Sequence, residues 1–281
     1  MRKGINIWSY RDGTTVAEAI RLAKAAGFDG IELALNETGE LSLESTAKDL
    51  AEIRDLLDAE GLELAGLATG LYWSYSMTSE REAVRAKAID ICKRQIETAA
   101  ALGADAILVV PGAVGVDFIP GSEVVDYDKA YDRALDAISK LAPEAGRAGV
   151  AIGIENVWNK FLLSPLEMRG FIDAVGSSAV GAYLDVGNTV ANGYPDQWIR
   201  ILGKRIQKVH FKDYRRAAGG LHGFVDLLAG DVDYPAVVRA LESIGYDGYV
   251  TAEMIPPYAH HSEQIIFNAS GAMDAILGRK G

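Results

Sequence analysis

The stretch AIGIENVWN, residues 151–159, begins as an apolar, strand-like run and then reaches a carboxylate, Glu155, followed by an aromatic loop. An uninterrupted apolar run is typical of a strand that is buried on both faces of a parallel sheet. An ionised glutamate at the end of such a run must be paired, bound to a metal or used in function, because an isolated charge is costly to bury. The stretch therefore predicts a parallel sheet with a polar site at the end of one strand.

Three later segments repeat this pattern. Each is a short apolar run that carries a metal-competent side chain at its end: VGAYLDVGN (180–188) with Asp185, IQKVHFKD (206–213) with His210, and GYVTAEM (248–254) with Glu253. Helical segments lie between the four runs. Since the carboxyl ends of the strands in a parallel barrel share one face, we expect these three side chains and Glu155 to converge.

The rest of the chain alternates strand and helix in the same way. Four earlier strands are expected at 4–10, 30–35, 63–69 and 106–112, and eight helices at 14–26, 43–60, 79–102, 127–148, 165–175, 195–203, 234–244 and 262–277. Eight such units predict a single-domain (β/α)8 TIM barrel spanning residues 1–281. A doubly wound open sheet is the alternative, but the turn after the first strand, SYRDGTT, has neither GxGxxG nor GxxxxGK[ST], so we favour the barrel.

Composition excludes several classes of function. The chain has 281 residues, a formal net charge of −11 and a pI near 4.9, which oppose binding to nucleic acid or to anionic membranes. No apolar run is long enough to span a bilayer, and the N-terminus lacks the pattern of a signal peptide. One cysteine, Cys92, cannot form an internal disulfide. We therefore expect a soluble cytoplasmic protein.

The four strand-end side chains together suggest a metal site. Three carboxylates and one imidazole suit a divalent ion such as Mn²⁺, Mg²⁺ or Co²⁺, and Zn²⁺ is also possible. Any one of the acids alone could be half of a buried ion pair, and a lone histidine could be a satisfied core residue. Their recurrence on four successive strands favours one shared ion.

The motifs IENVWN, YLDVGN, VHFKD and TAEM, in this order and at strand ends, carry a family resemblance. The whole chain resembles the xylose-isomerase-like sugar isomerase and epimerase superfamily, and within it the ketose and ketose-phosphate 3-epimerases, including L-xylulose-5-phosphate 3-epimerase. The resemblance implies a sugar or sugar phosphate substrate and one divalent ion, Mn²⁺ first among the candidates. It also implies that Glu155, Asp185, His210 and Glu253 bind the ion, and that the two glutamates transfer protons.

This chemistry has a physical rationale. A divalent ion that binds the O2 carbonyl and O3 hydroxyl of a ketose acidifies the C3 hydrogen and stabilises the cis-enediolate formed when it leaves. Epimerisation then needs a carboxylate on each face, one to take the proton and one to return it on the opposite side. Glu155 and Glu253 are the candidates, and which of them acts as the base depends on the handedness of the substrate.

Several positions depart from the free-ketose 3-epimerases or are expected to touch the substrate. Asn188 stands where those enzymes have a histidine, and Phe161 where they have a glutamate, whereas Arg216 is retained. These differences predict altered recognition of the carbonyl end of the sugar, and together with the basic residues after His210 they favour a phosphorylated pentulose over a free hexulose. The basic residue Lys212 is a further candidate contact, with a solvated basic rim as the alternative.

Aromatic residues near the strand ends are expected to form walls against the carbon faces of a sugar. They are Trp8, Tyr72, Trp73 and Trp158. Core packing or subunit contact explains such aromatics equally often, and a homodimer or homotetramer is possible. Glu32, inside the second strand, is expected either to support a ligand or to be ion-paired.

Other reactions are compatible with the same four ligands. An aldose-ketose isomerase or a keto-inositol-type dehydratase would use similar metal-stabilised enolate chemistry, and product analysis by NMR would separate them from an epimerase. An abasic-site endonuclease shares the superfamily fold but needs a histidine-rich zinc cluster and a basic surface, which four histidines and a charge of −11 disfavour. The presence of both Glu155 and Glu253 favours an enzyme over a non-catalytic sugar-binding protein, and proton exchange at a substrate carbon would separate the two.

Overall fold

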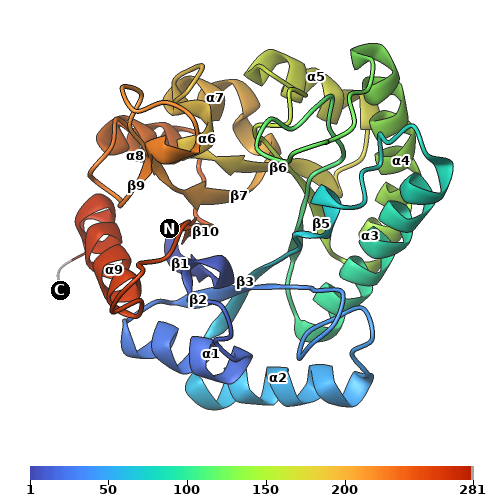
Figure 1. Ribbon diagram of the computed structural model, residues 1–281. Coiled ribbons are helices and arrows are strands. Elements are labelled where there is room, and N and C mark those ends of the chain that lie inside the picture. The colour runs from blue at the N-terminus through green and yellow to red at the C-terminus, as the bar shows by residue number, and fades with distance from the viewer. Residues whose placement is uncertain (280–281) are drawn as a thin grey trace.

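The barrel is closed by pairing between the two ends of the chain. In the computed structural model, which describes residues 1–279, β1 (Arg2–Asn6) runs parallel to β10 (Tyr249–Ala252), with Arg2 opposite Tyr249. The strand order around the ring is β1-β10-β7-β6-β5-β4-β3-β2 (Figure 1). The other strands are β2 (Gly30–Ala34), β3 (Glu63–Ala68), β4 (Ala106–Val109), β5 (Ala151–Glu155), β6 (Val180–Asp185) and β7 (Ile206–Phe211). The predicted (β/α)8 barrel is confirmed.

Helices surround the strands and follow them in sequence (Figure 1). They are α1 (Val16–Ala25), α2 (Ala47–Glu60), α3 (Glu82–Leu102), α4 (Tyr127–Ala148), α5 (Pro165–Val175), α7 (Pro195–Leu202), α8 (Tyr234–Ser243) and α9 (Gln264–Leu277). Their ends follow local chemistry: Thr15 and Glu18 form a capping box at the start of α1, and Gly61 ends α2 in the left-handed conformation at φ 59°.

The structure shortens two of the expected strands at the face that carries the candidate site. The first ends at Asn6 rather than Tyr10, because the Asn6 side chain accepts the backbone N–H of Trp8 and starts a 3₁₀ turn. The strand that contains Asp185 ends at that residue, whose side chain caps the short helix α6 (Val186–Thr189). Both turns start with a polar side chain that satisfies a free backbone N–H.

A small antiparallel hairpin follows β7 and was not expected from the sequence. Its strands are β8 (Asp213–Tyr214) and β9 (Phe224–Val225), each only two residues long. Strands this short leave no alternating pattern to detect. Among the described residues, no helix combines the length and the hydropathy needed to cross a bilayer.

Candidate metal and active site

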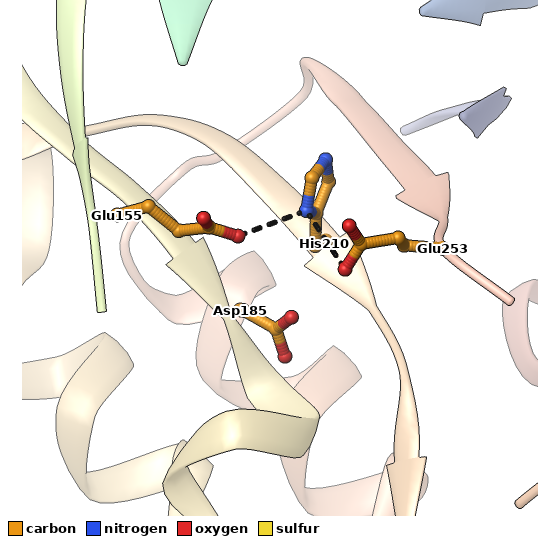
Figure 2. A group of neighbouring side chains, drawn as sticks. All are labelled: Glu155, Asp185, His210 and Glu253. Atoms are coloured by element: carbon orange, nitrogen blue, oxygen red, sulfur yellow. Dashed lines mark ion pairs between the residues drawn. The ribbon is translucent and has the colours of Figure 1, made fainter. Parts of the chain in front are cut away.

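The four side chains singled out by the sequence meet at one end of the barrel. Glu155 and Asp185 are the last residues of β5 and β6, His210 lies in β7, and Glu253 directly follows β10. One ligand atom from each lies within 4.8 Å of the others, and Figure 2 shows the side chains pointing toward a common centre. All four are buried, Asp185 and His210 completely.

The contacts inside this cluster match a cation-binding site. His210 Nδ1 lies 3.3 Å from Glu155 Oε1 and 3.7 Å from Glu253 Oε2 (Figure 2). That nitrogen, Asp185 Oδ2 and Glu253 Oε2 have no well-directed hydrogen bond to any described residue. Lys212 lies against the two carboxylate oxygens, so His210 Nδ1 is the atom left without a partner. Because buried polar atoms are nearly always satisfied, an unpartnered imidazole nitrogen facing carboxylates fits a divalent ion held by carboxylates and imidazole.

Lys212 lies at the edge of the same cluster. Its Nζ is 3.2 Å from Asp185 Oδ2, contacts Glu253 Oε2, and sits 4.8 Å from the ring centre of Phe224. Burial lowers the pKa of Lys212, but the surrounding carboxylates raise it further, so its net pKa lies above the ordinary value and the ammonium stays charged. Lys212 therefore offsets part of the negative charge beside the candidate ligands.

The two glutamates lie in different electrostatic surroundings. Burial raises the pKa of Glu155 to about 7, and the Glu253 carboxylate adds to the rise. Burial acts on Glu253 as well, but Lys212 and His210 outweigh it and hold the pKa of Glu253 below its ordinary value. Environments that move two carboxyl pKa values apart are typical of acid and base pairs in enzymes.

The raised pKa of Glu155 predicts a pH-dependent effect on stability. In metal-free protein the folded-state pKa of about 7 exceeds the ordinary 4.5, so the contribution of Glu155 to stability is lost as the pH rises through 7. Glu155→Gln removes this titration. We expect the metal-free variant to have a higher free energy of unfolding than metal-free wild type at pH 8, with a smaller difference at pH 5. Urea titrations at both pH values measure this, and a pH-independent difference would contradict it.

Two asparagines fix the backbone and carboxylate of Asp185. The Asn156 side chain accepts the N–H of Asp185 at 2.9 Å and donates to its carbonyl at 2.8 Å. Asn188 donates its backbone N–H to Asp185 Oδ1 at 2.8 Å and its side-chain N–H to the carbonyl of Asn156 at 3.0 Å. Asn188 thus helps to hold the candidate metal ligand, and its contact with the substrate stays a prediction. Asn156 is a supporting residue that the sequence analysis did not single out, although it follows Glu155 directly.

The other predicted substrate contacts have different surroundings. Tyr72 is only 2% exposed and donates its hydroxyl to Gln95, so its polar end is bonded in the core, and its role as a substrate wall stays a prediction. Arg216 is exposed, and its guanidinium donates to the carbonyls of Val190 and Gly193, which holds the loop after α6.

Two predicted aromatic residues remain near the strand ends. Trp8 is half-buried in the 3₁₀ turn after β1. Trp158 is half-buried, donates its indole N–H to the carbonyl of Asn188 at 3.0 Å and stacks on Phe224, with ring centres 5.0 Å apart. Phe224 also faces the ammonium of Lys212, so the pair of Trp158 and Phe224 borders the cluster. Phe224 belongs to the hairpin of β8 and β9, which the sequence did not predict.

Asp213 holds the base of that hairpin. Its fully buried carboxylate accepts the backbone N–H groups of Tyr214 at 2.8 Å, Gly230 at 3.0 Å and Val232 at 3.1 Å. A carboxylate bonded to several N–H groups organises a loop as a cap organises a helix end. Asp213 therefore helps to place Phe224 beside Lys212.

Replacement of Asp213 by alanine is expected to loosen this loop. The freed N–H groups should lower the free energy of unfolding by about 2 kcal/mol and speed amide exchange at Gly230 and Val232. Asp233→Ala is the matched control, since Asp233 caps α8 through the N–H of Ala236 at 2.9 Å and should speed exchange there instead. Unchanged exchange at Gly230 in the Asp213 variant would contradict this role.

Comparison with known proteins shows the family to which the chain belongs. Residues 20–273 match the family described as "Xylose isomerase-like TIM barrel". The chain belongs to this family. Among curated proteins similar to it, the 2-epi-5-epi-valiolone 7-phosphate 2-epimerase of Actinoplanes sp. is 28% identical, with 85% of each chain covered. A putative L-ribulose-5-phosphate 3-epimerase of Escherichia coli is 26% identical, with 94% of this chain and 92% of that protein covered.

Solved structures of sugar epimerases superpose along nearly the whole chain. A crystal structure of D-psicose 3-epimerase in the presence of D-fructose has a TM-score of 0.81 at 22% identity, covering 99% of this chain and 100% of that one. A structure of L-ribulose 3-epimerase has a TM-score of 0.78 at 20% identity, covering 99% and 94%. At this level of identity the similarity establishes the fold.

Proposed function

We propose that this protein is a divalent-metal-dependent enzyme that epimerises C3 of a ketose or ketose phosphate through a cis-enediolate. The observation that carries the proposal is the buried group of Glu155, Asp185, His210 and Glu253, whose ligand atoms lie within 4.8 Å of one another. Two similar curated proteins are named as epimerases, one of a valiolone phosphate and one, putatively, of ribulose 5-phosphate, and these activities support the same reaction class.

Each residue of the cluster has its own part in the proposed reaction. When bound, the divalent ion, with Mn²⁺ as the first candidate, supplies positive charge that stabilises the enediolate. Glu155 and Glu253 reach His210 from opposite sides (Figure 2), which supports one carboxylate on each face of a substrate. One glutamate removes the C3 proton and the other returns a proton on the opposite face. Asp185 and His210 serve as ligands, and Lys212 keeps a positive charge beside the carboxylates.

The deciding experiment is a substrate panel in D₂O with Mn²⁺. It contains ketopentoses, ketohexoses, their phosphates and 2-epi-5-epi-valiolone 7-phosphate, and NMR follows both product and deuterium incorporation. Deuterium at C3 of a ketose together with its C3 epimer supports the proposal. An aldose product would indicate an isomerase and loss of water a dehydratase, and no exchange with any member would reject the proposal.

A ketose phosphate is the substrate class that we favour, and Arg216 gives a test of how it is recognised. The guanidinium already donates to the carbonyls of Val190 and Gly193, so Arg216→Gln should act through the loop rather than through a phosphate. We expect KM to rise by a similar factor for a ketose phosphate and for its free sugar. A selective rise for the phosphate would instead identify Arg216 as a phosphate contact.

A further inference from the structure

Glu32, on β2, is a buried carboxylate that none of the proposed proton transfers uses. It has no exposed surface, and its Oε1 lies 2.9 Å from His210 Nε2. The opposite ring nitrogen, Nδ1, faces Glu155 and Glu253. Glu32 therefore contacts the imidazole on the side away from the other candidate ligands.

The hydrogen bonds around Glu32 decide where the imidazole proton lies. The backbone N–H of Trp8 can only donate, and it lies 2.7 Å from Asn6 Oδ1, so the side-chain amide of Asn6 presents its N–H groups to Glu32. Glu32 Oε1 accepts one of these groups and is thus an acceptor. The nearby Nε2 of His210 must then donate, so it carries a proton.

Tyr183 fixes the other oxygen of the same carboxylate. Its hydroxyl donates to Glu32 Oε2, and its ring packs edge-on against the His210 ring with centres 4.9 Å apart. Glycines on the neighbouring strands leave room for this pair. A Cβ on Gly66 would lie 2.6 Å from the Tyr183 hydroxyl and 3.1 Å from Glu32 Oε2, and one on Gly153 would lie 2.7 Å from Tyr183 Cδ2. The interior of the barrel is therefore shaped around Tyr183 and Glu32.

We propose that Glu32 is a positioning residue: it keeps the proton of His210 on Nε2 and so turns the Nδ1 lone pair toward Glu155 and Glu253. In its consequence for metal binding, this inference rests on the proposed function. A carboxylate behind a ligating histidine fixes the ring orientation and raises its basicity as a ligand. Loss of such a partner typically weakens metal binding by about 10- to 100-fold.

The test compares Glu32→Gln with Tyr183→Phe. Both changes remove one hydrogen-bonding function deep in the barrel and keep side-chain size, but only the first removes the carboxylate that faces His210. Zn²⁺ affinity, measured by competition with a chelator and without any sugar, should fall about 10- to 100-fold in Glu32→Gln and less than about tenfold in Tyr183→Phe. Equal losses in the two variants, or wild-type affinity in Glu32→Gln, would overturn the inference.

A second readout needs neither metal nor substrate. NMR of protein with ¹⁵N-labelled histidine, assigned with His210→Asn, should show a slowly exchanging proton on Nε2 of His210 in the wild type. This signal should exchange faster in Glu32→Gln, because a neutral amide oxygen accepts the Nε2 hydrogen bond more weakly than a carboxylate does. A wild-type Nε2 without a proton would overturn the inference even if metal binds. If the wild type bound no metal, the proposed function would fail, and this signal would still decide what Glu32 does.

Discussion

Replacing either Glu155 or Glu253 by glutamine is expected to lower kcat for epimerisation by about 10²- to 10⁴-fold, the range usual for loss of a general acid or base. Glutamine keeps the size of the side chain and one ligand oxygen, so metal affinity should fall less than kcat. One of the two variants should still exchange the C3 hydrogen with D₂O, because abstraction needs only one base. The opposite epimer should retain exchange in the other variant.

Steady-state kinetics at measured metal occupancy, together with NMR of the exchange, test this prediction. Glu242→Gln is the control, since Glu242 is exposed on α8 and its change alters net charge by the same amount. Asp185→Asn separates ligation from proton transfer: its activity should recover partly in excess metal, whereas that of the glutamate variants should not. Normal turnover by either glutamate variant at full occupancy would rule out the two-carboxylate mechanism.

Removal of divalent metal is expected to lower activity by at least about a thousandfold, because Lewis-acid stabilisation is worth several kcal/mol and about 1.4 kcal/mol corresponds to a tenfold change in rate. Addition of Mn²⁺ or Co²⁺ should restore activity, since carboxylate and imidazole ligands suit both ions. The assay uses chelator-treated protein whose residual metal content is measured by mass spectrometry. Full activity at negligible metal content would contradict the prediction.

The barrel and its candidate ligands could be predicted from the sequence because each depends on a local pattern. Apolar runs of strand length, each ending in a metal-competent side chain, specify both a parallel strand and the face on which Glu155, Asp185, His210 and Glu253 emerge. Contacts between distant segments left no such pattern. The sequence marks Glu32 as a support for a ligand or half of an ion pair, but nothing near residue 32 identifies His210 as its partner, because their contact depends on strands on different sides of the barrel.

Substrate contacts were the least predictable part for the same reason. Tyr72 and Trp158 look alike in sequence, as aromatic residues after a strand, yet Tyr72 bonds Gln95 in the core while Trp158 stacks on Phe224. Which of these happens depends on the helix or loop that packs against each ring. For Trp158 that partner is the hairpin of β8 and β9, whose strands are too short to show a periodic pattern.

The pairing of β1 with β10 ties the candidate site to the integrity of the whole polypeptide. Glu253 follows the strand that joins the two ends of the chain, and Arg2 lies opposite Tyr249 in that pair. The fourth candidate ligand is therefore placed only when β1 and β10 meet. A fragment that stops before β10 would keep Glu155, Asp185 and His210 but would lack Glu253, one of the two proposed bases. A fragment that lacks β1 would keep all four side chains but would lose the strand that pairs with β10, so neither fragment should catalyse epimerisation.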